Sequence, residues 1–285
     1  MSVNRRDFLR KAVSVPAAAL ASAIPNPKSQ IQAANAVLPT PAASGVDHIV
    51  VVMMENRSFD HMLGWLPNAN GVQAGLSYPD KNGNLQPTQR LNYYVGCSHP
   101  DPDHSYAGGR SEFDIGKMDG WLRTSSNDSF CIGYYEEEDL PLFATLARNY
   151  TTLNNYFPSI LSSTFPNRVF QHAAQTDRLS NTLDISTLPT IWDRLMAAGV
   201  SCRYYYSNVP FLAIWGTKYL GISALIEEFA LDAATGNLPA VSFVDPWFTI
   251  LDDGLGNDDH PHADLQGRDL FESDRDHSGR ESQLE

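Results

Sequence analysis

The sequence predicts an α/β fold with a mostly parallel central sheet that is flanked by helices. Two observations predict this class. Short apolar segments with the length of buried strands alternate with longer segments whose apolar residues recur at helical spacing. The chain also has 285 residues, of which 42% are hydrophobic, which is enough for one large core or two small ones.

Residues 1–36 are expected to form an export signal and not part of the fold. The segment "NRRDFLRKAVSVPAAALASAI" has a basic start and a short apolar stretch, and "AANA" offers a small-residue cleavage site after Ala36. The Arg5-Arg6 pair, followed by a Phe-Leu pair, is typical of the twin-arginine route. We therefore expect export to the periplasm, the cell surface or the medium, with a mature domain over 37–271. A chance amphipathic N-terminus is the alternative.

The first half of the domain is predicted to contain one strand and a long loop region. Residues 46–54 include "IVVVMM", which is apolar on both faces, as in the centre of a parallel sheet. Residues 68–135 are rich in Gly, Asn, Asp and Pro. We expect a long, ordered loop region there, with a short helix at "FDIGKMDGWLR".

Regular structure is predicted again from residue 140 onward. A helix is expected over 140–157, with Leu142 and Leu146 on one face. The next helix is predicted to have Pro166 at its first position. Two units of helix, glycine and strand then follow, and the second ends with a strand over 240–244.

Charge and cysteine content exclude some classes of function. The formal net charge is −13, and nucleic-acid binding relies on basic residues that neutralise phosphates, so no nucleic-acid partner is expected. Cys97, Cys131 and Cys202 are too widely spaced for a metal knuckle. One disulfide and one free thiol are compatible with the sequence, which leaves the pairing open.

Polar residues follow the predicted strand at 46–54 directly. Ligands bind at the carboxyl ends of strands in open parallel sheets, and Glu55 and Asn56 lie at such an end. A carboxylate beside an amide oxygen is a hard donor pair that suits a divalent cation. The alternative is a plain turn in which Asn56 or Ser58 caps the next helix.

The motif "STFPNR" places Thr164 just before the predicted helix start. Free backbone N–H groups at a helix N-terminus favour an anion such as phosphate. A threonine hydroxyl there could attack phosphorus if a metal lowered its pKa. The alternative is that Ser163 or Thr164 only caps the helix.

Imidazoles and carboxylates gather in "GNDDHPHADLQG" (256–267), after the last predicted strand. Such density favours metal ligation or phosphate contact, although an acidic, solvated loop is the alternative. In the weaker motif "HPDPDHSY" (99–106), His104 could reach the same site. The candidate residues of the motif at 256–267 are Asp258, Asp259, His260, His262 and Asp264.

Together these motifs resemble the bacterial phosphoesterase family of phospholipases C and acid phosphatases, within the alkaline-phosphatase-like superfamily. The resemblance is carried in order by "HIVVVMMENRSFDHMLG", "DHSY", "STFPNR" and "DDHPHAD", over about residues 46–271. It implies an alkaline-phosphatase-like fold and hydrolysis of a phosphodiester such as a phosphatidylcholine. Peripheral contact of the protein with a membrane is compatible with this activity. An acid phosphatase acting on small phosphomonoesters is the close alternative. A sulfatase of this superfamily is disfavoured. Sulfatases carry a Cys or Ser in a different nucleophile motif, and no cysteine lies near Thr164.

The resemblance also implies a metal site. Glu55 and Asn56 would be the first ligands of one divalent metal ion, whose identity the sequence leaves open. Asp259 is added to this set because it stands beside His260 in the third motif. The expected cofactor is therefore a single divalent cation at the carboxyl end of the first strand.

Catalytic and substrate-binding roles follow from the same resemblance. Thr164 would be the nucleophile and would form a phosphoryl-enzyme intermediate. His104 and His260 would contact the phosphoryl group or the leaving oxygen. Asn167 and Arg168 are assigned to the substrate-binding side, where they would shape the nucleophile turn more than touch the substrate.

The family pattern stops after "DLQGRDLF". Family members are expected to continue with a long helix and with a strand ending in an Asp-Glu pair that completes the metal shell. Residues 272–285 form instead a polar tail that is expected to be disordered. We therefore expect a domain that is incomplete on its C-terminal side, through truncation, a frameshift or a shortened gene model. Weak activity would follow, and a non-catalytic remnant is the alternative.

Overall fold

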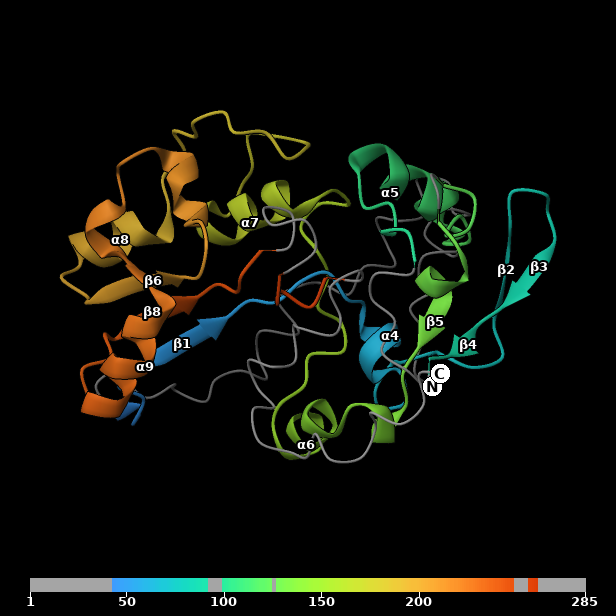
Figure 1. Ribbon diagram of the computed structural model, residues 1–285, viewed down its shortest axis with the longest axis horizontal. Helices are drawn as coiled ribbons and strands as arrows, with labels where there is room; N and C mark the ends of the chain where they lie inside the picture. Colours follow the sequence, from blue (N-terminus) through green and yellow to red (C-terminus); the bar gives the residue numbers. More distant parts are fainter. Residues whose placement is uncertain (1–42, 92–98, 125–126, 249–255, 261–285) are drawn as a thin grey trace, which may run out of the picture.

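The computed structural model describes residues 43–91, 99–124, 127–248 and 256–260 of the chain. Within this part, a parallel sheet is formed by four strands in the order β1-β8-β6-β7 (Figure 1). The predicted α/β class with a parallel sheet is confirmed, and the arrangement is consistent with an alkaline-phosphatase-like fold. The strands are β1 (Ile49–Val52), β6 (Cys202–Tyr206), β7 (Ser223–Leu225) and β8 (Val241–Val244).

The register of the sheet brings three strand ends to one level. Val52 of β1 pairs with Val244 of β8, and Val244 also pairs with Tyr205 of β6. All three strands are parallel, so their carboxyl ends lie at the same edge of the sheet. Residues that follow β1 and β8 are therefore brought close together, although almost 200 positions separate them in the sequence.

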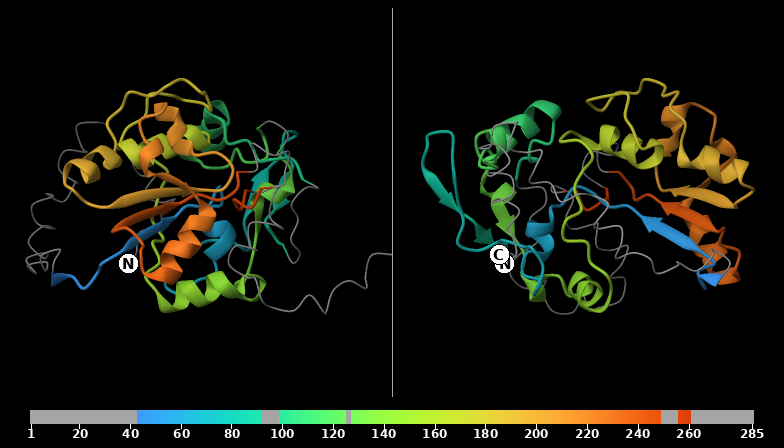
Figure 2. Two further views of the ribbon diagram at one scale, coloured as in Figure 1. Left: turned by 60° about the vertical axis from the view of Figure 1, so that its left-hand side comes forward. Right: turned by 180° about the vertical axis from the view of Figure 1, so that it is seen from behind.

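Helices cover both faces of the sheet. Helices α7 (Thr164–Ala173) and α8 (Ile191–Ala197) lie on one side, and α9 (Ile226–Thr235) lies on the other (Figures 1 and 2). Successive strand residues point to opposite faces, so Tyr204 joins the core beneath α7 and α8, whereas Tyr205 packs against α9.

The main core is aromatic and surrounds a buried histidine of α7. The ring centroids of Phe243, Phe211, Trp192, Tyr204 and Trp215 lie between 4.9 and 6.1 Å from that of His172. The indole Nε1 of Trp192 donates a hydrogen bond to His172 Nδ1 at 3.3 Å. Burial, together with the nearby Arg168 charge, lowers the pKa of this imidazole to about 3, so the ring is neutral at physiological pH.

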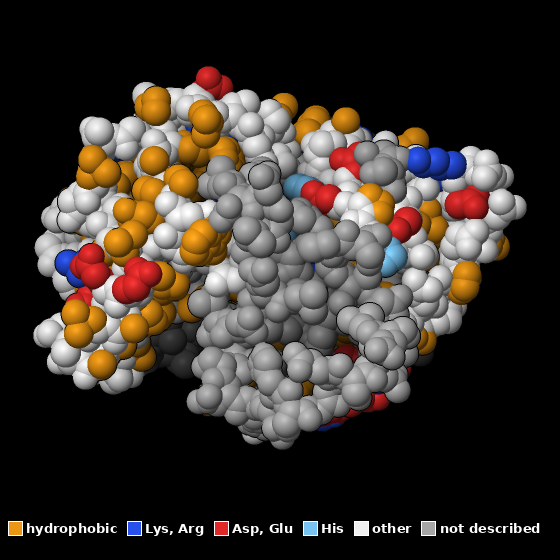
Figure 3. Space-filling view, viewed as in Figure 1, with side chains coloured by type: hydrophobic (Ala, Val, Ile, Leu, Met, Phe, Trp, Pro, Cys, Tyr) orange, Lys and Arg blue, Asp and Glu red, His pale blue; other side chains and the backbone are white. Residues whose placement is uncertain are grey.

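Among the described strands, β1 lies at an edge of the sheet, and its exposed side chains contradict the prediction of a strand buried on both faces. Ile49, Val50 and Val52 are 54%, 39% and 44% exposed, and only Val51 packs against the main core. The physical reason is the order of the sheet. Helix α9 packs on β6 and β7 at the far side, and β1 pairs with β8 alone among the described strands. Exposed hydrophobic side chains are spread over the half of the molecule that contains the parallel sheet (Figure 3).

A second part of the chain, between β1 and α7, is built from short elements beside the sheet (Figure 1). The predicted loop-rich character of this region is confirmed, and the short helical piece predicted at 113–123 corresponds to a 3-10 helix over Asp114–Gly116. The α-helix before it was not predicted and ends at Phe113, because Asp114 and Ile115 have positive φ angles of 38° and 55°. Its helical elements are α4 (Phe59–Leu63), α5 (Tyr106–Phe113), η3 (Asp114–Gly116), η4 (Ser129–Ile132), η5 (Glu137–Asp139) and α6 (Pro141–Asn149). Its strands are β2 (Ser77–Pro79), β3 (Leu85–Pro87), β4 (Gln89–Arg90) and β5 (Gly133–Tyr134).

The structure also differs from the predictions in the boundaries of two helices and in the face of one. Helix α6 stops at Asn149 because Tyr150 is extended, and Leu146, on the predicted apolar face, is 45% exposed. Helix α7 begins at Thr164, two residues before the predicted first position. The short strand β7 before α9 was not predicted; it continues directly into the helix, so no turn residue marks it. The remaining described elements of the sheet half are η6 (Phe211–Trp215) and η7 (Leu220–Ile222).

Two further expectations concern cysteines and membranes. Cys131 and Cys202 are both free thiols, so they do not form a disulfide with each other, and Cys97 lies outside the described residues. Among the helices of the described chain, none has the length and apolarity needed to cross a membrane. The expected signal over 1–36 and the polar tail over 272–285 also lie outside the described residues.

We expect His172 to make stability fall with decreasing pH. Its pKa of about 3 in the folded chain lies below the ordinary value of 6.5, so its contribution is fully present above pH 6.5 and is lost toward pH 3. Between pH 7.5 and 5.0 this costs about 2 kcal/mol of unfolding free energy. Urea unfolding of the parent and of His172→Gln at both pH values should show a smaller pH dependence in the variant. An equal pH dependence in both would contradict the assignment.

Candidate active site

The site lies at the carboxyl edge of the sheet, where β1 and β8 deliver one carboxylate each. Asp245 follows β8 directly, and Glu55 follows β1 after two methionines. Both carboxylates are buried, with side-chain exposures of 0% for Asp245 and 9% for Glu55. The backbone N–H of Glu55 donates to the Asp258 carbonyl at 2.8 Å, which ties the first strand to the segment 256–260.

A fully buried guanidinium joins the two carboxylates. Arg168 Nη1 donates to Asp245 Oδ1 at 2.5 Å, and Arg168 Nε donates to Glu55 Oε2 at 3.3 Å. The second Asp245 oxygen accepts a hydrogen bond from the Tyr204 hydroxyl. Arg168 Nη2 has no hydrogen-bond partner among the described residues, so one buried donor of this cluster stays available at the site.

Burial sets the protonation behaviour of this cluster. Desolvation raises the pKa of Asp245 to about 6 and outweighs the lowering effect of Arg168. Desolvation also raises the pKa of Glu55, with Arg168 opposing it and the Asp258 carboxylate adding to it. The two carboxylates raise the pKa of Arg168 despite its burial, so the guanidinium stays charged.

The hydroxyl of Thr164 points into this cluster. Thr164 Oγ1 donates to Glu55 Oε1 at 3.3 Å. Thr164 is the first residue of α7, and Ser163 is the N-cap, although its side chain makes no capping bond. The structure therefore does not support the capping alternative for either side chain. It also limits the predicted anion site, because the Phe165 N–H donates to Asn181 Oδ1 at 2.8 Å and Pro166 has no N–H.

Asn167 shapes the turn that leads into α7. Its Nδ2 donates to the carbonyls of Ser162 and Ser163 at 3.0 and 3.2 Å, and its Oδ1 accepts from the backbone N–H of Ile160 at 3.3 Å. Both polar ends of the amide are therefore engaged with backbone. This geometry agrees with the expectation that Asn167 holds the nucleophile turn in shape.

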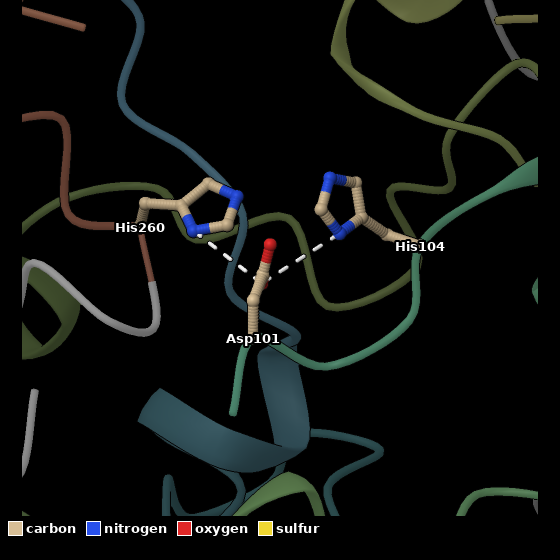
Figure 4. Close-up of side chains that lie close together, drawn as sticks. All are labelled: Asp101, His104 and His260. Atoms are coloured by element: carbon tan, nitrogen blue, oxygen red, sulfur yellow. Dashed lines mark ion pairs between the residues drawn. The ribbon is translucent and has the colours of Figure 1, made fainter. Parts of the chain in front are cut away.

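Two histidines from distant segments meet around Asp101 (Figure 4). Asp101 Oδ1 lies 3.7 Å from His104 Nδ1 and 3.6 Å from His260 Nδ1, and the two imidazole centroids are 5.2 Å apart. His104 Nδ1 also donates to the Pro102 carbonyl at 2.9 Å. One ligand atom from each of the three side chains lies within 4.8 Å of the others, so the group could hold a metal ion.

Arg57 anchors the segment that carries His260. Its Nε donates to the Asp259 carbonyl at 2.8 Å, and its Nη1 contacts His61 Nε2 at 2.8 Å. Because His61 Nδ1 donates to the Gly133 carbonyl at 2.9 Å, His61 Nε2 is the acceptor for Arg57 in the neutral ring. Arg57 thus connects the residues that follow β1 to the segment 256–260 and to α4.

The structure gathers most of the predicted site residues in one place. Glu55, Thr164 and Arg168 are in direct contact, and His104 and His260 meet each other. Asn56 is exposed, whereas Asp259 is buried with a positive φ angle of 64°. The backbone N–H of Glu55 donates to the carbonyl of Asp258, two residues before His260, so the two groups of side chains are linked through this segment. The further candidates His262 and Asp264 lie outside the described residues.

Three residues of the site were not predicted from the sequence. Asp245 stands directly after a predicted strand, which is the same signal that identified Glu55. Asp101 precedes His104 by three residues in an acidic loop, and no regular pattern distinguishes it from its neighbours. Arg57 lies inside the motif that follows β1, but the sequence does not indicate where its long side chain points.

Comparison with known proteins gives a consistent picture. The sequence profile of the Phosphoesterase family matches residues 46–272. The chain is 30% identical to non-specific phospholipase C1 of Arabidopsis thaliana over 268 residues, which covers 85% of this chain and 50% of that protein. It is 27% identical to phospholipase C B of Mycobacterium tuberculosis over 309 residues, covering 87% of this chain and 58% of that protein.

A third relative is the non-hemolytic phospholipase C of Pseudomonas aeruginosa. It is 30% identical over 237 residues, covering 72% of this chain and 33% of that protein. The chain therefore spans from a third to somewhat more than half of the length of these curated relatives.

We expect Asp245→Asn to destabilise the fold strongly. The substitution removes one of the two charges that compensate the buried Arg168, and breaking a buried ion pair in this way costs about 3–5 kcal/mol. Asp119→Asn is the matched control, because Asp119 pairs with Arg123 at the surface, where loss of a pair costs about 1 kcal/mol or less. Urea unfolding measures both. Similar losses for the two variants would show that Arg168 does not depend on Asp245.

Proposed function

The chain belongs to the Phosphoesterase family, and on that premise we propose that it is a phospholipase C-type hydrolase acting on phosphodiesters such as phosphatidylcholine. The observation that carries this proposal is the contact of the Thr164 hydroxyl with the buried Glu55 carboxylate. The imidazole centroids of His104 and His260 lie 5.2 Å apart, and the Glu55 N–H donates to the carbonyl of Asp258, two residues before His260. A hydroxyl, a carboxylate and two imidazoles form the set that nucleophilic substitution at phosphorus requires.

In the proposed first step, Thr164 Oγ1 attacks the phosphorus atom. Glu55 accepts the hydroxyl proton along the existing hydrogen bond between Thr164 Oγ1 and Glu55 Oε1. The bond between phosphorus and the diacylglycerol oxygen breaks, and a protonated imidazole of His104 or His260 donates the proton that this oxygen needs. The product is a phosphoryl-threonine that still carries the head group.

In the second step, water attacks the phosphorus atom of the phosphoryl-threonine. The imidazole that lost its proton takes one from this water, and Glu55 returns its proton to Thr164 as the O–P bond to threonine breaks. The phosphorylated head group leaves, and all side chains regain their starting protonation. Arg168 contributes by holding Glu55 in place, because its Nε–H binds the carboxylate oxygen that does not face Thr164.

A divalent metal ion is part of the proposal, and the charges of the site fit one. Four carboxylates and two guanidinium groups belong to the site, and this acidic set of oxygen donors suits a divalent cation. When bound, such an ion supplies positive charge that stabilises phosphoryl oxygens and lowers the pKa of a nearby hydroxyl. The carboxylates are Glu55, Asp245, Asp258 and Asp259, and the guanidinium groups are Arg57 and Arg168.

Two sets of residues compete for this ion. We propose Glu55, Asn56 and Asp259, whose oxygen donors suit a hard cation and leave both imidazoles available for proton transfer. Asp101 with His104 and His260 is the alternative set, in which nitrogen donors suit zinc or another transition metal. In that case the imidazoles would be ligands and could not serve as proton donors.

Location and contact with lipid are proposed on the sequence alone. We propose export by the twin-arginine route, on the basis of the Arg5-Arg6 pair. An exported phospholipase would meet its substrate at a membrane surface, so peripheral contact with lipid accompanies this proposal. No nucleic-acid partner is proposed, because a protein with a net charge of −13 repels the phosphate backbone of a nucleic acid.

We expect Thr164→Ala to lower turnover by about 10³-fold or more, because a covalent nucleophile is lost. Thr164→Ser is the matched control, since it keeps a hydroxyl at the start of α7 and should retain measurable turnover. The measurement is release of phosphocholine from dihexanoylphosphatidylcholine, with mass spectrometry of acid-quenched protein to detect phosphoryl-threonine. Alanine activity within tenfold of the parent would remove Thr164 from the mechanism.

Release of inorganic phosphate from small monoesters, without phosphocholine release, would favour the acid phosphatase alternative. Absence of both activities in the parent chain would favour a non-catalytic remnant.

We expect Glu55→Gln to reduce bound divalent metal, while Asp101→Asn retains it. The reason is that the first change removes a charged oxygen ligand of the proposed set, and the second leaves that set intact. Metal content after dialysis against a trace-metal mixture, measured by mass spectrometry, gives the answer without any activity assay. The reverse pattern would assign the ion to Asp101, His104 and His260, and would exclude these imidazoles as proton donors.

A further inference from the structure

An apolar pocket of about 200 Å³ lies beside the nucleophile turn. Every side chain that lines it is apolar, and three of them are phenylalanines. Pockets lined in this way bind ligands by excluding water from hydrocarbon surface. The lining residues are Phe165, Leu183, Val209, Pro210, Phe211, Ala213, Ile214 and Phe248.

The pocket shares residues with the proposed reaction site. Phe165 directly follows Thr164, so the pocket wall begins one peptide unit from the proposed nucleophile. The ring of Phe248 covers the Arg168 guanidinium, with the Cζ atom 4.4 Å from the ring centroid. One face of the Arg168 cluster therefore borders the pocket, while its hydrogen bonds hold Glu55 on the other side.

We propose that this pocket binds a short alkyl segment of a phosphodiester substrate, and this rests on the function proposed above. The volume supports a small apolar group: an apolar cavity of about 150 Å³ already accommodates benzene. A complete acyl chain is larger than this, so the pocket would hold the part of the substrate nearest the glycerol. Transfer of each CH₂ group from water would contribute to binding of the lipid in the transition state.

The described lining of the pocket favours a hydrocarbon segment over a cationic head group. No acidic side chain is among the described lining residues, and the Arg168 guanidinium lies behind the ring of Phe248. Arg168 also lies 5.9 Å from the centroid of Phe211, so both rings already face a cation on one side. A quaternary ammonium group would therefore meet repulsion, and a hydrocarbon segment would not.

The mouth of the pocket continues onto an apolar surface. Leu183 and Val209 line the pocket and remain 81% and 43% exposed. Side chains so exposed would allow a longer hydrocarbon chain to leave the pocket and continue along the protein surface. Hydrophobic side chains are also numerous on the half of the molecule that carries α7 to α9 (Figure 3).

The test fills the pocket from its exposed side. Ala213→Phe adds a ring at a lining position that is exposed, and Ala234→Phe makes the same change at an exposed position on α9, on the opposite face of the sheet. For each variant, kcat/KM is measured on dihexanoylphosphatidylcholine and on glycerophosphocholine, which has no acyl chains. We expect Ala213→Phe to lower the ratio of the two values by about tenfold or more, and Ala234→Phe to leave it unchanged.

A binding measurement keeps this inference separate from the proposed catalysis. Saturable fluorescence of 11-(dansylamino)undecanoate, a fatty-acid probe, should weaken about tenfold in Ala213→Phe and also in Leu183→Ser, but not in Ala234→Phe. If the parent hydrolyses neither substrate, the proposed function fails, whereas selective loss of probe binding still supports the pocket. Unchanged probe binding in both pocket variants overturns the pocket assignment. An equal loss of kcat/KM on both substrates in Ala213→Phe also overturns it.

Discussion

The architecture of the site depends on the burial of one positive charge. Arg168 is fully buried, and a buried guanidinium is tolerated only when carboxylates compensate it. Glu55 after β1 and Asp245 after β8 provide that compensation. A helix and two strands that are distant in sequence must therefore meet at one point. The rest of the sheet edge, including the Tyr204 hydroxyl bound to Asp245, is arranged around this requirement.

The same ion-pair cluster positions the proposed nucleophile. Thr164 and Arg168 are four residues apart in α7, so they lie on one face of the helix, one turn from each other. Glu55 binds both, with one carboxylate oxygen for each. The Thr164 hydroxyl is consequently held by the interaction that stabilises the fold. The structural role of Glu55 and its proposed chemical role therefore coincide in one carboxylate.

Much of the site could be predicted because strand ends and helix starts leave local signals. Glu55 follows an apolar run, and Thr164 precedes a proline near a helix start. The sequence could not show that β1 is an edge strand, because an apolar run does not specify which elements cover it. Asp101 escaped prediction because its role depends on His104 and on a histidine more than 150 residues away. Long-range contacts of this type have no periodicity to detect.

The edge position of β1 has a consequence for how the site would fail on heating. Among the described strands β1 bonds to β8 alone, and its side chains contribute little to the aromatic core around His172. Amide groups of such a strand open at a lower free energy than those of β6 and β8, which are paired on both sides. Fraying of β1 would separate Glu55 from Arg168, so the buried ion pair opposes this opening. The lifetime of the contact between Glu55 and Thr164 would thus be set by the balance between this ion pair and the edge position of β1 among the described strands.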